Sequence, residues 1–348
     1  MNTSDWRPAA SIENLQIVAR MLQNIRAQFQ HWGILEVSVP CISSAASPAA
    51  HLDSISVAAP THTPVPTPTL DHQADAQNNR HFLQTSPEFF MKRLLCSGSG
   101  PIYRIGPSFR QAEVSPRQNP EFTMLEWYRP EWHYVQLMDE VEQLVLSILA
   151  EADVLGEANI EQLSYRDLFL EYTQLDPHQA DLSQLIQCAS NTLGYQQSES
   201  LDAISGGQSR DQWLELIYSG YILPKTSERC LSVFDFPKGQ AELAETGVDP
   251  HGNPIAKRFE LYIKGIELAN GYQELTDATE LQRRFEQWNT QRQTLGKATM
   301  PIDHRLLAAQ QHGLPFCSGV ALGVDRLAMS LIGTTNINDV LAFPIGRA

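Results

Sequence analysis

The feature that most constrains the fold is a pair of β-prone runs joined by a polar loop, between residues 106 and 130. The loop is rich in Ser, Pro, Gln and Asn, and the chain returns from it through residues 121–128. Two such runs around a polar loop predict a long antiparallel hairpin. Side chains alternate along a strand with a period of two, so every second residue of the returning strand shares one face. The residues on that face are Phe122, Met124, Glu126 and Tyr128.

The chemistry of this face suggests a binding pocket. It carries an aromatic ring, a carboxylate and a phenol, and Arg110 lies on the partner strand. A guanidinium binds phosphate, a ring stacks on a base and an acid pairs with a cation. Together these groups suit a pocket for a nucleotide and an ammonium group. An ordinary half-buried hairpin with one surface ion pair would contain the same residues, so the hairpin alone leaves both interpretations open.

The composition of the chain excludes several classes of protein. Its 348 residues and 42% hydrophobic content allow a sizeable core, and no window resembles a transmembrane span. A net charge of −15 argues against a broad nucleic-acid surface and suits either simple solubility or a basic protein partner. The five cysteines form no C-x-x-C pair, so neither zinc nor a disulfide framework is indicated. The first residues lack signal-peptide features, and we expect a cytoplasmic protein without a membrane contact.

The first third of the chain predicts a helix, a strand and a long loop. Helical periodicity covers residues 11–31, and alternation covers residues 34–40. Residues 43–80 are rich in Ala, Pro, Thr and His with little periodicity, which predicts a long mobile loop. The tetrapeptide Thr85-Ser86-Pro87-Glu88 has the form of a helix start. Glu88 is therefore either part of a helix cap or a ligand contact.

The middle of the chain predicts mainly helices. Residues 135–150 carry a strong apolar stripe, which predicts a helix. Between residues 178 and 230 helical segments alternate with Gly and Ser breaks. We interpret this region as a helical insertion without visible chemistry, after which residues 231–237 resume the sheet.

A second informative stretch, residues 258–274, contains three carboxylates at seven-residue steps, Glu260, Glu267 and Glu274. Lys264-Gly265 signals a tight hairpin, across which the first two acids would face each other. Two acids close together favour a divalent cation, and Mg²⁺ on the phosphates of a nucleotide needs few protein ligands. Three solvent-facing acids on an exposed hairpin are the alternative.

A third stretch, residues 313–331, is a glycine-punctuated strand that runs into a helix. Gly319 and Gly323 would let a ligand approach the backbone, and Arg326 lies in the first helical turn. Tight contact between helix and sheet would explain the same glycines. The P-loop and dinucleotide-binding fingerprints are absent, so the two commonest nucleotide-binding folds do not explain the pattern.

Together the three stretches resemble the motifs of class II aminoacyl-tRNA synthetases, specifically the lysyl branch. The segments concerned are TSPEFFMKRLL, FR-loop-NPEFTMLEWY, RFELYIKGIELANGYQEL and GVALGVDRL, in that family's order and spacing. The resemblance covers nearly the whole chain from about residue 11. It implies an α+β fold, an antiparallel sheet flanked by helices, as a single catalytic domain over residues 1–348. The segment from Trp32 to Pro40 resembles the family's first motif, which implies a homodimer.

Three features of the sequence differ from those of lysyl-tRNA synthetases. The chain starts almost at the first motif, without the anticodon-binding barrel of a lysyl-tRNA synthetase, and Ala321 stands where the third motif normally has glycine. Both features match a truncated paralogue that attaches (R)-β-lysine to a lysine side chain of elongation factor P and not to tRNA. The second motif usually reads Arg-Asn-Glu, with its Glu on the adenine amino group, whereas this chain has Arg110-Gln111-Ala112. Backbone groups or Glu113 would substitute for that contact.

The resemblance implies residue roles in an adenylation reaction that uses ATP and Mg²⁺. Arg110 would hold the α-phosphate and Arg326 the γ-phosphate, as the catalytic pair. The implied ATP-binding residues are Arg110, Gln111, Ala112, Asn119, Phe122, Glu267, Leu268, Gly323 and Arg326. The implied substrate-binding residues are Ser86, Pro87, Glu88, Glu126, Tyr128, Asn270, Tyr272, Glu274 and Ala321. The implied metal ligands are Glu260 and Glu267.

Within the substrate-binding set, the distal ammonium would meet Glu126, Tyr128 and Glu274. Glu88 would hold the amino group at the reacting end, and the methyl of Ala321 would favour the β-amino isomer. Two other functions fit part of the pattern, a minimal lysyl-tRNA synthetase and a non-catalytic protein that binds an adenylate or amino acid and regulates a partner. The missing anticodon module opposes the first, and the two arginines and three glutamates oppose the second.

Overall fold

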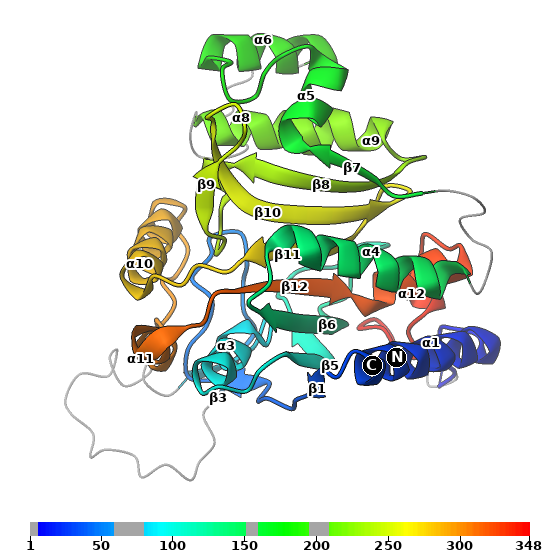
Figure 1. Cartoon of the computed structure of the whole chain (residues 1–348). Coiled ribbons are helices and arrows are strands. Elements are labelled where there is room, and N and C mark those ends of the chain that lie inside the picture. The colour runs from blue at the N-terminus through cyan, green and yellow to red at the C-terminus, as the bar shows by residue number, and fades with distance from the viewer. Residues whose placement is uncertain (1–5, 59–79, 151–158, 195–208) are drawn as a thin grey trace.

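A computed structural model describes residues 6–58, 80–150, 159–194 and 209–348 (Figure 1). Within these ranges nine strands form one open sheet in the order β1-β5-β6-β12-β11-β10-β8-β7, with β9 paired to β10. The strands are β1 (Leu35–Glu36), β5 (Ile102–Phe109), β6 (Glu121–Pro130), β7 (Glu161–Ser164), β8 (Cys230–Pro237), β9 (Thr246–Val248), β10 (Pro254–Ile263), β11 (Ile266–Gln273) and β12 (Cys317–Gly323). All neighbours pair antiparallel except β1 with β5 and β7 with β8. The predicted α+β fold with a largely antiparallel sheet is confirmed.

A small second sheet lies beside the first. It joins β2 (Ile42–Ser43), β4 (Arg80–Leu83) and β3 (Ser56–Ala58) in the order β2-β4-β3. The β3 strand lies within the segment predicted as a loop and pairs with β4 through Ser56 and Phe82. The rest of that predicted loop, residues 59–79, lies outside the described part of the chain.

Helices cover the sheet and its ends (Figure 1). They are α1 (Ile12–His31), α3 (Glu88–Cys96), α4 (Tyr134–Ala150), α5 (Tyr165–Thr173), α6 (Leu182–Leu193), α8 (Arg210–Ile217), α9 (Leu223–Lys225), α10 (Ala278–Thr294), α11 (His304–Gly313) and α12 (Val324–Ile332). A π-helical turn, η1 (Tyr218–Ile222), joins α8 to α9, and two 3₁₀ turns are η2 (Lys238–Gln240) and η3 (Ile337–Asp339). The predicted helix at residues 11–31 is confirmed, with Ser11 accepting a hydrogen bond from Asn14 N as its cap.

The main core lies between the sheet and the layer formed by α1, α4 and α12. Leu125 and Trp127 of β6 and Leu322 of β12 contribute to it, together with the apolar stripe of α4. Because side chains alternate along a strand, the residues between them point to the other face of the sheet. That other face carries the candidate site.

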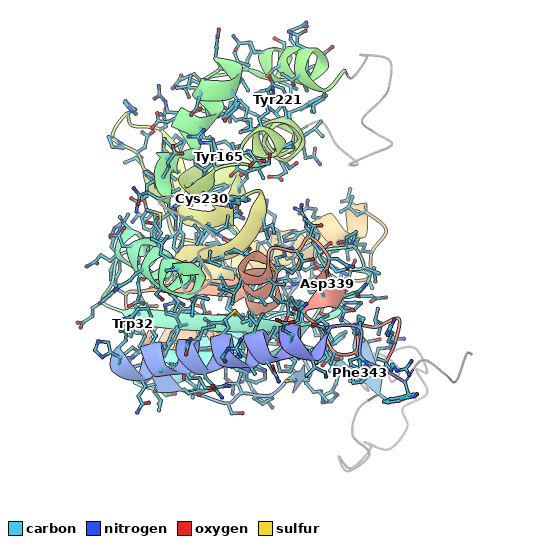
Figure 2. The ribbon with its side chains drawn as sticks, turned by 90° about the vertical axis from the view of Figure 1, so that its right-hand side faces the viewer. Trp32, Tyr165, Tyr221, Cys230, Asp339 and Phe343 are labelled. Carbon is cyan, nitrogen blue, oxygen red and sulfur yellow. The ribbon has the colours of Figure 1, made fainter. Side chains whose placement is uncertain are left out.

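The outer strands β7, β8 and β10 carry a separate apolar cluster with the helices α5, α6 and α8. Figure 2 shows this region, marked by Tyr165 and Tyr221, above the layer that contains α1. Of these helices, α6 and α8 lie in the described part of the predicted insertion, residues 178–194 and 209–230, together with η1 and α9, whereas α5 precedes it. No helix in the described ranges combines the length and apolar character needed to cross a membrane.

The structure confirms both predicted hairpins and shortens one strand. Lys264 and Gly265 join β10 to β11 with φ values of 46° and 74°, the positive pair that a tight mirror-image turn requires. The strand predicted at residues 34–40 is wrong beyond Leu35–Glu36. There β1 is an edge strand that pairs only with the start of β5, and Pro40 has no N–H with which to extend the ladder.

Candidate active site

One cavity of about 420 Å³ collects most of the predicted site residues. Those that line it are Ser86, Glu88, Arg110, Asn119, Phe122, Glu126, Tyr128, Glu260, Glu267, Leu268, Asn270, Tyr272, Glu274, Ala321, Gly323 and Arg326. Three predicted residues are not part of this lining, namely Pro87, Gln111 and Ala112. Segments far apart in the sequence therefore meet here, including both arginines and all three acids of the second stretch.

The floor of the cavity consists of two adjacent cross-strand rows on one face of the sheet. Strand pairing aligns the first row as Glu126, Ala321, Asn270 and Glu260, from β6 through β12 and β11 to β10. It aligns the second row as Tyr128, Gly319, Tyr272 and Arg258. Period-two alternation therefore brings six predicted residues, together with Gly319 and Arg258, onto one surface.

Gly319 has a reason to be glycine that differs from the predicted one. A Cβ atom at this position would lie 2.3 Å from Glu274 Oε1 and 2.4 Å from Cε1 of Tyr128. The groups that approach the backbone closely here are thus side chains of the protein. The absence of a side chain at Gly319 lets the carboxylate and the phenol come together.

Glu126 is a buried carboxyl held by two hydroxyl groups. Ser86 Oγ donates to Glu126 Oε2 at 2.7 Å, and the hydroxyl of Tyr128 donates to Glu126 Oε1 at 2.7 Å. Burial, with the negative charge of Glu88 as the next contribution, raises the pKa of Glu126 to about 8. A cation that binds beside Glu126 would lower this pKa and so favour the ionised carboxylate.

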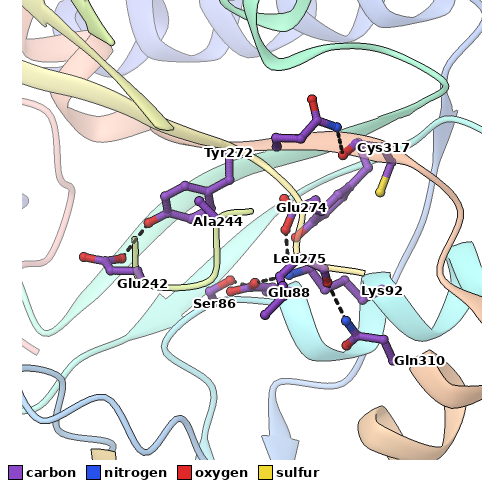
Figure 3. A network of polar contacts seen from close by, with 12 residues as sticks. Ser86, Glu88, Lys92, Glu242, Ala244, Tyr272, Glu274, Leu275, Gln310 and Cys317 are labelled. Atoms are coloured by element: carbon purple, nitrogen blue, oxygen red, sulfur yellow. Dashed lines mark hydrogen bonds and ion pairs between the residues drawn. The ribbon is translucent and has the colours of Figure 1, made fainter. Parts of the chain in front are cut away.

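Lys92 links two further carboxylates and was missed by the sequence reasoning. Its Nζ lies 2.6 Å from Glu88 Oε1 and 2.6 Å from Glu274 Oε2 (Figure 3). Burial alone would lower the pKa of Lys92, but the charges of Glu274 and Glu88 outweigh burial and raise it. The lysine is therefore charged. The only signal in the sequence was the four-residue spacing from Glu88 to Lys92 on one helix.

Glu274 completes this cluster of acids. Burial raises its pKa to about 7, against the opposing effect of Lys92. Glu88, Glu126 and Glu274 all line the cavity and are linked to one another through Ser86 and Lys92, and we call these three residues the acid cluster. Its carboxylates can balance the ammonium groups of a bound amino acid.

The two predicted phosphate-binding arginines line the same cavity. The guanidinium carbon of Arg110 lies 5.1 Å from the centre of the Phe122 ring, and its Nη1 lies 3.6 Å from Glu113 Oε1. Arg326 Nη1 donates to the backbone oxygen of Glu267 at 3.0 Å and lies 3.3 Å from Glu267 Oε2. Both contacts are partly solvent-exposed ion pairs, which an anionic ligand can replace at small cost.

Hydrogen bonds between elements hold the part of the cavity around Arg326 and the hairpin loop in place. Asp325, next to Arg326, accepts a hydrogen bond from Thr123 N at 2.8 Å and so ties the start of α12 to β6. Asn119 donates to Glu121 O at 2.6 Å and accepts from Ile345 N at 3.0 Å. The side chain of Asn119 thus connects the end of the hairpin loop to the C-terminal segment of the chain.

The two predicted metal ligands both line the cavity, but they are not cross-strand partners. Glu260 pairs in register with Asn270, and Glu267 pairs with Tyr262. The expectation that Glu260 and Glu267 face each other directly is therefore wrong, because the two-residue turn Lys264-Gly265 sets Tyr262, and not Glu260, opposite Glu267. The two carboxylates nevertheless influence each other. Burial raises the pKa of Glu260 to about 7, and the negative charge of Glu267 contributes to this rise.

The donor set fits a magnesium ion with few protein ligands. Glu260 accepts from Arg258 Nη2 and from the hydroxyl of Tyr262, and each carboxylate oxygen retains a second acceptor direction. Glu267 is half-exposed at the cavity wall. Within the described residues no group of three or more His, Cys, Asp and Glu side chains is arranged to hold a metal. Two carboxylates suffice only for a cation that keeps waters or ligand oxygens, as Mg²⁺ does.

Arg258 and Glu242 are further cavity residues that the sequence reasoning missed. The guanidinium of Arg258 lies 4.7 Å from the Phe236 ring centre and donates to Asn270 Oδ1 at 3.2 Å. It also lies 3.4 Å from Glu242 Oε1, and the hydroxyl of Tyr272 donates to Glu242 Oε2 at 2.6 Å. Glu242 has a φ of 47°, a left-handed conformation that non-glycine residues adopt mostly at constrained sites.

Comparison with known proteins agrees with this architecture. The family model of class II tRNA synthetases (D, K and N) matches residues 2–347. Three curated relatives carry the name elongation factor P–(R)-β-lysine ligase. The protein from Proteus mirabilis is 43% identical over 346 residues, that from Yersinia enterocolitica 42% over 347, and that from Hamiltonella defensa 41% over 347. Each alignment covers 99% of this chain and 99% of the relative.

Proposed function

Because this chain belongs to the class II tRNA synthetase family, we propose that it is an ATP-dependent ligase that acts on elongation factor P. It activates (R)-β-lysine as an aminoacyl-adenylate and transfers the β-lysyl group to a lysine side chain of elongation factor P. The observation that carries this proposal is one cavity lined both by two arginines, Arg110 and Arg326, and by the three glutamates of the acid cluster. This arrangement suits a triphosphate joined to an amino acid with two ammonium groups.

The activation step depends on positioning and charge. The carboxylate of the amino acid attacks the α-phosphate of ATP, and pyrophosphate leaves, with no covalent intermediate on the protein. Arg110 holds the α-phosphate and Arg326 the γ-phosphate, after exchanging their contacts with Glu113 and Glu267 for phosphate oxygens. Arginine is suited to this because its planar guanidinium can pair with two oxygens at once.

The adenine ring stacks on Phe122, and Asn119, Leu268 and Gly323 line the same cavity. Glu113 also lines the cavity, whereas Ala112 does not and has a left-handed φ of 63°. Of the substitutes expected for the missing motif glutamate, the side chain of Glu113 is therefore the better supported. Gln111 and Ala112 do not line the cavity, and Gln111 N donates to Asp53 O at 2.8 Å, so the nucleotide contacts predicted for these two residues are not supported.

Glu260 and Glu267 hold Mg²⁺ in this proposal. The ion would neutralise charge on the phosphates of ATP, which is what a hard cation with oxygen ligands supplies in phosphoryl and nucleotidyl transfer. The raised pKa of Glu260 supports this role, because a cation beside the two carboxylates relieves their repulsion.

The amino acid lies on the cross-strand rows. Glu126, Tyr128 and Glu274 receive its distal ammonium, with Asn270 and Tyr272 beside them. Glu88 receives the second amino group, and Ser86 and Pro87 position the start of α3, where Ser86 Oγ accepts from Glu88 N at 3.0 Å. The methyl of Ala321 lies between Glu126 and Asn270 in the first row, where it limits the space for the substrate.

The second step transfers the activated acyl group. The acceptor lysine attacks the carbonyl carbon of the mixed anhydride as a neutral amine, an amide bond forms and AMP leaves. This chemistry needs no tRNA.

Pyrophosphate exchange tests the activation step. We expect exchange with β-lysine that exceeds exchange with α-lysine. In the same assay Glu274→Gln should raise the KM for β-lysine about tenfold or more while the KM for ATP changes about twofold or less, because Glu274 touches only the amino-acid end. An equal loss of both would contradict the assigned role, and no exchange with either amino acid would contradict the proposal itself.

We also propose that the ligase works as a homodimer in the cytoplasm. Leu35 of the edge strand β1 is 56% exposed and Ile42 of β2 is 45% exposed, so the first-motif region presents apolar side chains to a partner. All five cysteines are free thiols, which suits a reducing compartment. Light scattering on the purified chain measures the assembly, and a monomer at micromolar concentration would contradict it.

A further inference from the structure

Lys92 is buried at the wall of the acid cluster and has no role in the reaction described above. It is 2% exposed and does not itself line the cavity, whereas its partners Glu88 and Glu274 both do (Figure 3). Stability alone is a weak reason for such a group, since buried ion pairs can often be replaced by apolar residues without loss. A buried charge between two ligand-binding carboxylates points to a role in the site.

The two ion pairs of Lys92 hold Glu88 and Glu274 at a fixed separation, and we call this arrangement the clamp. One Nζ atom contacts Oε1 of Glu88 and Oε2 of Glu274, each at 2.6 Å. Both carboxylates are therefore tied to the same point, and the spacing between their remaining oxygens is fixed. Glu274 is also confined from the other side, because its Oε1 abuts the backbone at Gly319. A ligand with two ammonium groups meets acceptors at a set separation.

The charge of the cluster also depends on Lys92. When ionised, Glu88, Glu126 and Glu274 carry three negative charges, and Lys92 carries one positive charge, which leaves two. Two ammonium groups match this remainder. In the described part of the chain, further titratable groups beside the cluster are Cys96 on α3, Cys317 on β12, Tyr128 on β6 and Tyr272 on β11. Burial raises the pKa of all four, so they are neutral near pH 7.

We propose that Lys92 is a positioning residue for substrate selection, which holds Glu88 and Glu274 at the spacing of the two ammonium groups of β-lysine. In α-lysine the two amino groups are one carbon further apart, so the same clamp fits them less well. This inference rests on the proposed function and adds to it the group that sets the separation of the two ammonium sites.

Lys92→Met tests the clamp in pyrophosphate exchange. We expect the KM for β-lysine to rise about tenfold, because the two carboxylates lose their shared partner. The ratio of kcat/KM for β-lysine over α-lysine should fall about fivefold, while the KM for ATP stays within about twofold. The rise of kcat/KM for β-lysine with pH should move upward by about one pH unit, since loss of a neighbouring positive charge raises a carboxyl pKa.

Two variants complete the experiment. Lys92→Arg keeps the charge but holds the glutamates differently, so it should lower the β-over-α ratio even if Lys92→Met does not fold. Lys257→Met is the matched control, because Lys257 pairs with Glu245 at 3.1 Å and neither residue lines the cavity. It should leave the ratio and the pH profile unchanged.

The outcomes separate the clamp from the proposed function. Unchanged β-over-α ratios in both Lys92 variants, with a wild type that exchanges, would overturn the clamp alone. The clamp would also be overturned if the KM values for ATP and for β-lysine rose equally and the pH profile did not shift. That result would indicate that Lys92 has only a structural role. A wild type that exchanges with neither amino acid would overturn the proposed function and the clamp with it.

Discussion

Glu126 shows how one buried carboxyl makes ligand binding depend on pH. Its pKa of about 8, set first by burial and then by Glu88, means that it is mostly protonated at pH 7. A bound ammonium favours the carboxylate and lowers this pKa, so binding releases a proton. The affinity for β-lysine should therefore rise as the pH rises from about 6 to about 8.

Calorimetry of β-lysine binding in two buffers with different ionisation enthalpies measures this proton release. Glu126→Gln should reduce both the release and the slope of affinity with pH. The share of the proton release that comes from Glu274, whose pKa is raised to about 7, should remain. Binding with no net proton release at pH 7 would show that the carboxyl is already ionised.

Ala321 lies where a single methyl group limits the amino-acid site. Register places it between Glu126 and Asn270 on the cavity floor. Ala321→Gly should lower the β-over-α preference about tenfold, because a site that differs by one methyl or methylene discriminates by about that factor. Pyrophosphate exchange with both isomers measures the ratio, and an unchanged ratio would remove Ala321 from the specificity determinants.

At the scale of elements, the site depends on how α12 is fastened to β6. Asp325 accepts from Thr123 N, and burial raises the pKa of Asp325 to about 6, so its carboxylate still predominates at pH 7. Asp325→Ala should cost about 1–3 kcal/mol of unfolding free energy, because the partly buried N–H of Thr123 loses its partner. The KM for ATP should rise more than that for β-lysine, since Arg326 follows directly.

Asp277→Ala is the matched control for this tether. Asp277 caps α10 by accepting from Thr279 N and Glu280 N, and it does not line the cavity. Its loss should cost about 1 kcal/mol and leave the KM for ATP unchanged. Urea unfolding and ATP kinetics on both variants provide the comparison, and equal effects on the KM for ATP would contradict a positioning role for Asp325.

The elements that sequence reasoning predicted well are those whose signal is local. The helix at residues 11–31 and the two hairpins follow from periodicity and turn residues, and the structure confirms them. The strand at residues 34–40 failed because its length depends on a partner strand that local alternation does not reveal. For the same reason β3 was predicted as loop, since its pairing with β4 comes from a segment distant in the sequence.

At the scale of the whole molecule, the cavity is assembled from four strands, the starts of two helices, and several loops and turns. The resemblance to a family supplied many of the residues that line it, but not the groups that hold those residues in place. Lys92 and Arg258 act through contacts with residues that the fold brings near, and Glu242 enters the cavity from a turn that no motif marks. Such supporting groups follow from three-dimensional contacts, so a single sequence does not show them.

The central claim is that this cavity activates β-lysine and passes it to a protein. The most direct measurement is mass spectrometry of elongation factor P after incubation with the chain, ATP, β-lysine and tRNA in one reaction. We predict that elongation factor P gains one β-lysyl group on a single lysine, that AMP and pyrophosphate accumulate, and that the tRNA stays unmodified. Unmodified elongation factor P together with aminoacylated tRNA would contradict the account.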